Sequence, residues 1–203
     1  IKKKKQYTKK KNINILDILD VFAPALVLAQ AIGRWGNFFN QEAYGPLVNG
    51  YHGHPLTSDE LIAQRETLRH LLVPNFVIDQ MYLTSKVLVD GGYKYVTGYY
   101  HPTFFYESML CLIGFILLHI FTVKFRRYDG QTFLCYILWY GLGRFFIEGT
   151  RTDSLYIGDT SLRVSQVLSI AIVAVCLALL VINLVKVKKN PQPIEGVDFF
   201  PAD

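Results

Sequence analysis

The sequence predicts an all-α, polytopic membrane protein with four transmembrane helices and one long loop region outside the membrane. Two observations favour this fold class. Hydrophobic residues make up 51% of the 203-residue chain and charged residues only 18%, which is a low charge content for a soluble domain. The charges are also clustered, so that long neutral runs separate them, and about 20 apolar residues are enough to cross a bilayer.

Four segments are expected to span the membrane. The clearest is 163–186, which contains 22 consecutive residues without a charge. The other three, in chain order, are predicted at 14–40, 102–125 and 131–149. Pro24 lies inside the first of them and is expected to bend it, because proline removes a backbone hydrogen bond of the helix.

The placement of the basic residues predicts which loops face the cytoplasm. Thirteen of the 21 basic residues lie at 2–11, 124–127 and 186–189, and short cytoplasmic loops are enriched in lysine and arginine. We therefore expect the segments 1–13, 126–130 and 187–203 to be cytoplasmic, and the loops 41–101 and 150–162 to lie outside. The net charge of +5 then reflects topology and contact with membrane lipids, and no nucleic acid is predicted as a partner.

The loop 41–101 is too long for a simple turn. It contains strand-like and helix-like patches (61–72; 76–82) and a glycine- and tyrosine-rich end, and we expect it to fold over the outer end of the helices. The three cysteines all lie inside predicted spans, where packing or lipid contact explains them better than a disulfide. Because the chain begins with isoleucine and opens into a basic loop, we expect it to be the C-terminal part of a longer protein.

A polar stripe is predicted along the span 131–149 and its outer end. Tyr140, Arg144, Glu148 and Arg151 are spaced four, four and three residues apart, which places them on one face of a helix. Ionisable residues in a span face protein or a water-filled cavity and need partners, and Glu148 can hold either arginine. The stripe alone leaves two interpretations open: an ion pair that fixes helix packing, or a functional site.

The first span ends in a similar stripe of Arg34, Asn37 and either Gln41 or Glu42. Both helices are expected to run outward, and Arg34 and Arg144 each lie roughly 20 Å along their helices at about 1.5 Å per residue. The two arginines should therefore reach similar depths. Two guanidinium groups that converge there can clamp one phosphodiester in a bidentate manner, which lysine does less well.

Histidines provide two further candidates. His101 opens the segment HPTFFYES, with Glu107 in the same outer layer, and it is either a proton carrier, a phosphate contact or a satisfied interfacial histidine. His52 and His54 resemble a metal pair, but no nearby carboxylate or cysteine completes a set of ligands. The sequence therefore predicts no metal site and no cofactor.

Three segments together resemble the signature segments of the bacterial prolipoprotein diacylglyceryl transferase family, in the order of that family. They are GRWGNFFNQEAYG at 33–45, HPTFFYES at 101–108 and YGLGRFFIEGTRTDSL at 140–155. The resemblance implies a multi-pass enzyme of the bacterial inner (plasma) membrane with seven spans, of which this chain would hold the last four.

The resemblance also implies the activity. Members of the family transfer the diacylglyceryl group of phosphatidylglycerol to the lipobox cysteine thiol of a prolipoprotein, which forms a thioether and releases glycerol phosphate. The essential histidine of the family would precede this chain, because His52, His54 and His101 do not match it. Position 104, often glutamine in the family, is Phe104 here, so no polar role is assigned to it.

Carried over residue by residue, the resemblance implies catalytic roles for Asn37, Glu42, Tyr140, Arg144 and Glu148. It implies substrate binding by Arg34, Gly45, His101 and Arg151. Arg34 matches the arginine associated with phosphatidylglycerol, and Arg144 matches the arginine regarded as essential on the later helix. In this hypothesis Glu42 and Glu148 hold the two arginines, while Asn37 and Tyr140 orient the reacting groups.

Two functions of other classes compete with this interpretation. A transporter or lipid-binding protein could also keep paired arginine and glutamate residues inside a helix bundle, although paired broken helices in repeated halves are absent from the sequence. A phosphatidyltransferase of the CDP-alcohol type would need a cluster of metal-binding aspartates. Asp17 and Asp20 are expected on the cytoplasmic side without partners in such a run, so the sequence argues against that enzyme.

Overall fold

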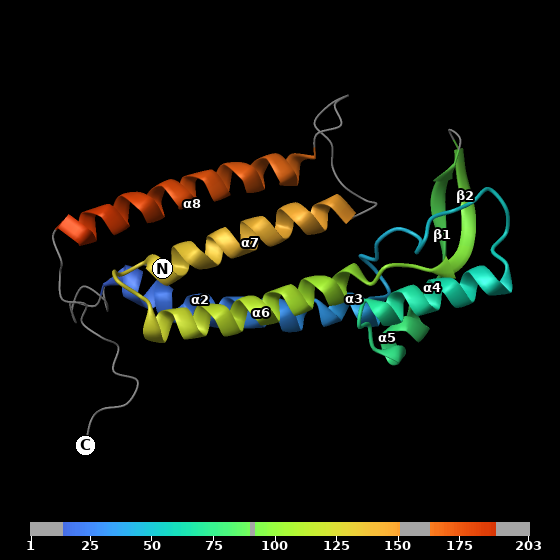
Figure 1. Ribbon diagram of the computed structural model, residues 1–203, viewed down its shortest axis with the longest axis horizontal. Coiled ribbons are helices and arrows are strands. Elements are labelled where there is room, and N and C mark those ends of the chain that lie inside the picture. Colours follow the sequence, from blue (N-terminus) through green and yellow to red (C-terminus); the bar gives the residue numbers. More distant parts are fainter. Residues whose placement is uncertain (1–13, 90–91, 151–162, 190–203) are drawn as a thin grey trace, which may run out of the picture.

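The computed structural model describes residues 14–89, 92–150 and 163–189. Its main layer consists of four long helices that run side by side (Figure 1). They are α2 (Ile15–Gly33), α6 (Thr103–Lys124), α7 (Gln131–Thr150) and α8 (Val164–Lys189). Helix α2 contacts α6 and α7, and α8 packs against α7. The protein is therefore predominantly helical in the part that the structure describes.

Three helical segments of the described residues are long and apolar enough to cross a membrane. They are Ile15–Asn40, which joins α2 to the short helix α3 (Trp35–Asn40), Thr103–Lys124 and Val164–Lys189. These segments support the prediction of a helical membrane protein. Helix α7 has 20 residues and lies between the others, but it includes Arg144 and is less apolar, so the predicted fourth span stays a proposal.

The 41–101 region adds a small mixed unit at one end of the helices (Figure 1). It contains α4 (Ser58–His70), α5 (Asn75–Gln80) and an antiparallel pair of strands, β1 (Tyr82–Val89) and β2 (Gly92–Tyr99), in which Tyr82 faces Tyr99. The all-α prediction is wrong for these two strands. In β2 the buried Val96 and Gly98 alternate with exposed residues, which is the period of a half-buried strand.

The core of this unit joins it to the helices. Its buried apolar residues include the first residues of α6, and its members are Val48, Leu68, Val73, Val77, Ile78, Met81, Phe104 and Phe105. Gln64 on α4 is buried as well, and its amide donates to the Val48 carbonyl at 2.8 Å and accepts from the Tyr99 amide at 3.0 Å. Because the nitrogen and the oxygen of the Gln64 side-chain amide are both hydrogen-bonded, α4 is fixed to the loop and to β2, and the buried Gln64 side chain leaves no polar atom unpaired.

Close contacts between the helices fix their depth relative to one another. Ser108 on α6 donates a hydrogen bond to the Ala31 carbonyl on α2 at 2.8 Å. The Trp139 indole on α7 donates to the Leu110 carbonyl on α6 at 3.2 Å, and it lies where a Cβ on Gly114 would stand. Glycine at that position thus admits the large ring between α6 and α7.

A buried carboxylate ties α2 to the start of α7. Asp20 is fully buried, and its two oxygens accept hydrogen bonds from the amides of Gly130 and Phe133, both at 2.8 Å. These are donors that the first turn of α7 leaves unpaired, so Asp20 caps that helix from a neighbouring one. Arg126 completes the cluster, 2.6 Å from Asp17 and 3.7 Å from Asp20.

Replacing Asp20 by alanine is expected to lower the free energy of unfolding by about 3 kcal/mol, because two buried amides and Arg126 lose their partner. Thermal unfolding in detergent checks this, with Asp59→Ala on the exposed first turn of α4 as the matched control. A midpoint for Asp20→Ala as high as that of Asp59→Ala would contradict the capping role.

Candidate functional site

Arg34 lies at the junction between α2 and α3. Its amide donates to the Gln30 carbonyl and its carbonyl accepts from the Asn37 amide, both at 3.1 Å. The backbone at Arg34 is right-handed helical, with φ −64° and ψ −23°, so the chain stays helical through the junction. The fixed backbone directs the guanidinium toward α6, where its partner lies.

Three charged side chains from three helices meet at this level. Nη2 of Arg34 is 2.5 Å from Oε1 of Glu107 on α6, and Nη1 of Arg144 on α7 is 3.9 Å from the same oxygen. The Glu107 side chain is only 11% exposed, and both arginine side chains are about twice as exposed. The two arginines that the sequence placed at similar depth thus converge on one buried carboxylate.

This cluster is suited to bind an anion. Two guanidinium groups and one carboxylate leave these three side chains with a net charge of +1. Each guanidinium has five N–H donors in a rigid fork, a geometry that matches the oxygens of a phosphate. In a water-poor environment, such a fork binds phosphate strongly and in a defined orientation.

Glu42 does not hold Arg34, contrary to the prediction from sequence. It is exposed, and its carboxylate accepts from the Asn40 amide at 3.1 Å. The reason is the backbone at Gln41, which takes the left-handed conformation with φ 51° and ends α3. Glu42 therefore lies beyond the helical stripe, and the partner of Arg34 is Glu107.

Asn37 and Tyr140, which were also predicted for the site, lie on α3 and α7, close in sequence to the two arginines of the cluster. Asn37 is half-buried on α3, three residues after Arg34. Tyr140 lies one turn before Arg144, and its ring centroid is 6.3 Å from that of Tyr136, whose hydroxyl accepts from the Gln30 amide at 3.0 Å. The side chain of Glu148 and all of Arg151 lie outside the described residues.

Gly45 and His101 meet through their backbones beside the start of α6. The Gly45 amide donates to the His101 carbonyl at 2.8 Å, and a Cβ on Gly45 would lie 2.8 Å from Cγ2 of Thr103. Glycine is therefore required here by close packing, whether or not a ligand is bound. Nδ1 of His101 lies 3.1 Å from the Tyr106 hydroxyl, and burial lowers the pKa of His101, which favours the neutral imidazole at neutral pH.

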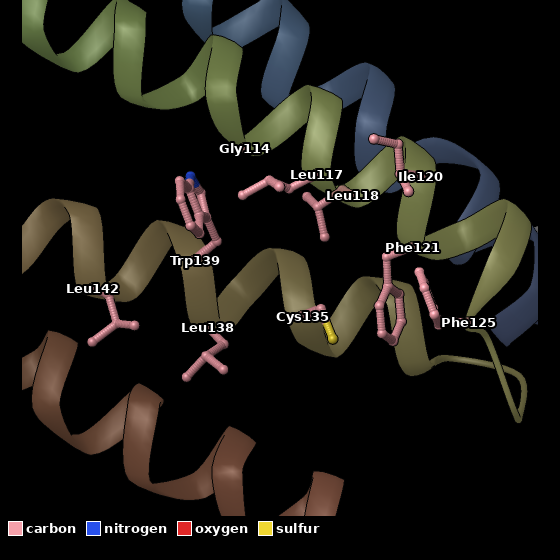
Figure 2. Close-up of a pocket in the computed structure, with 10 residues that line it drawn as sticks. All are labelled: Gly114, Leu117, Leu118, Ile120, Phe121, Phe125, Cys135, Leu138, Trp139 and Leu142. Carbon is pink, nitrogen blue, oxygen red and sulfur yellow. The ribbon is translucent and has the colours of Figure 1, made fainter.

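An apolar groove of about 380 Å³ lies between α6 and α7 (Figure 2). Its lining runs from Gly114 on α6 to Phe125, which directly follows that helix, and from Cys135 to Leu142 on α7. It contains no charged side chain, and on α6 it begins two turns beyond Glu107. The groove can take hydrocarbon, but the groups that could perform chemistry lie in the charged cluster. Among the described residues, no group of three or more His, Cys, Asp or Glu is placed to hold a metal ion.

Comparison with known proteins decides the family. Residues 5–182 match the family described as prolipoprotein diacylglyceryl transferase. The chain belongs to this family. The match covers all three charged residues of the cluster, so Arg34, Glu107 and Arg144 form a site within a member of the prolipoprotein diacylglyceryl transferase family.

Similar proteins carry the name phosphatidylglycerol–prolipoprotein diacylglyceryl transferase. One from Staphylococcus xylosus is 41% identical over 178 residues, which is 88% of this chain and 53% of that protein. Another from Listeria monocytogenes serotype 4a is 44% identical over 91% of this chain and 55% of its own length. A third, from Staphylococcus aureus, is 40% identical over 95% and 58%, respectively. The chain thus spans about half the length of these curated relatives.

Glu107 is the residue that sequence reasoning named but did not assign to the site. One signal could have found its role. Glu107 is the only carboxylate in the segment 102–125, and a lone carboxylate in an apolar span requires a cationic partner. Arg34 and Arg144 were the two cations expected at a similar depth.

Proposed function

We propose that the protein transfers the diacylglyceryl group of phosphatidylglycerol to the lipobox cysteine thiol of a prolipoprotein. The thiol gives up its proton, which in the overall balance leaves with the glycerol phosphate, and its sulfur forms a C–S bond to the glycerol carbon of the diacylglyceryl group. The C–O bond from that carbon to the phosphate breaks, and glycerol phosphate leaves with the bonding electrons. The products are a thioether-linked lipoprotein and glycerol phosphate.

The observation that carries this proposal is the convergence of Arg34 and Arg144 on Glu107 in a chain of this family. The reaction needs stabilisation of the negative charge that grows on the leaving phosphate. Fixed guanidinium groups in a site with little water provide that stabilisation without reorganising. The names of the relatives give phosphatidylglycerol and prolipoprotein as their substrates, and we extend both to this protein.

In the proposed mechanism the two arginines have different tasks. Arg34 binds the phosphodiester of the lipid, and Arg144 stabilises the leaving phosphate. Arg144 also favours the thiolate form of the substrate cysteine, because a free cysteine thiol has a pKa near 8.5 and is mostly protonated at neutral pH. Glu107 is a positioning residue that holds both guanidinium groups at one depth. Asn37 and Tyr140 orient the reacting groups, and the predicted contributions of Glu148, Arg151, Gly45 and His101 to this site are retained as proposals.

We further propose that α7 crosses the membrane together with α2, α6 and α8, so that the chain contributes four spans, the last four of seven. Contacts with α2, α6 and α8 shield much of α7 from lipid, which supports a membrane location despite Arg144. The basic segments 1–13, 126–130 and 187–203 would then face the cytoplasm of a bacterial cell. The cluster of arginines would lie in the outer half of its plasma membrane.

Replacing Arg34 by lysine is expected to lower the turnover number by about 10-fold or more, because lysine keeps the charge but loses the bidentate fork. Product formation is measured as the diacylglyceryl adduct on a synthetic lipobox peptide with phosphatidylglycerol as the donor. Arg127→Lys, at an exposed arginine in the loop before α7, is the matched control. Full activity of Arg34→Lys would contradict bidentate recognition of the phosphate.

A further inference from the structure

Large apolar side chains are exposed where the 41–101 region meets α3. Leu72 in the turn after α4 is 84% exposed, and Phe39 on α3 is 78% exposed. Leu71 in the same turn and Phe76 at the start of α5 are exposed as well. In water this surface would be unfavourable, because Leu72 and Phe39 would keep most of their apolar area hydrated and Leu71 and Phe76 about half of theirs.

Helix α5 lies alongside α3 and points in the same direction. At its start, Phe76 stacks on Trp35 with ring centroids 6.1 Å apart and is 6.1 Å from the ring of Phe38. At its end, the Gln80 side chain accepts a hydrogen bond from Gln41 at 3.1 Å. Both helices are placed at the same end of the long helices in Figure 1. The turn 71–74, which precedes α5, is therefore level with the start of α3 and not with its end.

The depth of Trp35 follows from helix geometry. The segment Ile15–Asn40 is long and apolar enough to span a membrane, and its charged end is marked by Asp17 and Asp20. A hydrocarbon core of about 30 Å takes about 20 residues of helix, so a core that begins after Asp20 reaches Asn40. Trp35 then lies about 7 Å inside the core boundary at 1.5 Å per residue.

We infer that the turn 71–74 between α4 and α5 inserts into the acyl-chain layer of the membrane, beside α3. Phe39 lies seven residues after Ile32, so the two exposed side chains share one face of the segment Ile15–Asn40, and the exposed Leu72 lies beside the start of α3. These exposed side chains lie at the depth of a membrane-spanning segment, where lipid acyl chains surround the protein. We therefore infer that lipid hydrocarbon covers them.

The backbone of the turn ends α4 and holds Leu72 in its exposed position. Leu72 has φ 58°, a conformation that leucine rarely adopts and glycine adopts without cost. The cap of α4 offsets this strain, because the Leu72 amide donates to the Arg69 carbonyl at 2.9 Å and the Val73 amide donates to the Leu68 carbonyl at 3.1 Å. Transfer of the exposed leucine side chain from water into lipid would add a further gain. Arg69 on the last turn of α4 donates from Nε to the Asn75 side chain at 3.2 Å and so holds the turn closed.

Site-directed spin labelling tests the inference in the protein reconstituted into phosphatidylglycerol-containing bilayers. A label is attached at Leu72→Cys in a background where the three native cysteines are alanine, and Asp59→Cys at the far end of α4 is the matched control. Collisions with oxygen, which concentrates in hydrocarbon, are compared with collisions with a water-soluble nickel chelate. We expect the ratio to shift toward oxygen at position 72 and toward nickel at position 59.

Two results would overturn the inference. Equal nickel accessibility at 72 and 59 would place the turn in water, and protection of position 72 from both reagents would place it under another protein segment. A second measurement avoids the cysteine background. Benzoylphenylalanine introduced at position 72 of the otherwise native protein is expected to yield photoadducts with phosphatidylglycerol, and adducts with protein alone would contradict lipid contact.

Discussion

Replacing Arg144 by alanine is expected to lower formation of the diacylglyceryl adduct by about 10²–10³-fold, the usual loss when one preorganised donor to a developing anion is removed. Arg144 approaches the oxygen of Glu107 that also holds Arg34, so it is placed to share the phosphate with Arg34. The measurement is the rate of adduct formation on a lipobox peptide at saturating phosphatidylglycerol.

The control for this prediction is Arg127→Ala, at an exposed arginine beside the opposite end of α7, which should keep the activity of the native protein. Arg144→Lys should fall between the two variants, since it keeps the charge but not the planar fork. Activity of Arg144→Ala within about twofold of the native protein would remove Arg144 from the proposed mechanism.

Replacing Glu107 by glutamine is expected to lower the turnover number by about 10²-fold, without raising the KM for phosphatidylglycerol. Glutamine keeps the size of the side chain, but the two guanidinium groups lose the charge that holds them together. A misplacement of about 1 Å in a positioned group can cost this factor. The positive charges that attract the lipid phosphate remain, so binding of phosphatidylglycerol should persist.

The separation of the turnover number from KM identifies a positioning role for Glu107. A merely structural role would lower the thermal midpoint and the fraction of folded protein, while the folded fraction would keep its turnover number. Glu66→Gln is the matched control, because Glu66 also pairs with an arginine, Arg69 at 2.5 Å, but on the exposed surface of α4. An unchanged turnover number in Glu107→Gln would refute the proposed role.

The helical part of the fold could be predicted because membrane spans leave a strong signal. Long apolar runs with few charges indicate the positions of α2, α6 and α8. The hairpin of β1 and β2 was missed because its alternation is incomplete. Tyrosines and Leu88 point to the exposed face of the hairpin, where a typical strand would carry polar residues, so the pattern of period two is weak.

Part of the candidate site could be predicted as well. Helix arithmetic brought Arg34 and Arg144 to one depth, and the structure brings both to the same carboxylate. Periodicity shows which residues share the face of one helix, but not which faces of different helices meet. The helical stripe therefore favoured Glu42 as the partner of Arg34, and the left-handed backbone at Gln41, which ends α3, could not be read from the pattern.

The proposed reaction is tested most directly by mass spectrometry of a synthetic lipobox peptide after incubation with phosphatidylglycerol and the protein in its full length, purified in detergent. We expect the peptide to gain one diacylglyceryl group on its cysteine, with release of an equal amount of glycerol phosphate. The adduct should be lost when the peptide cysteine is replaced by serine. A folded protein that binds phosphatidylglycerol but forms no adduct would contradict the transferase reaction and would leave the arginine cluster a lipid-binding or structural site.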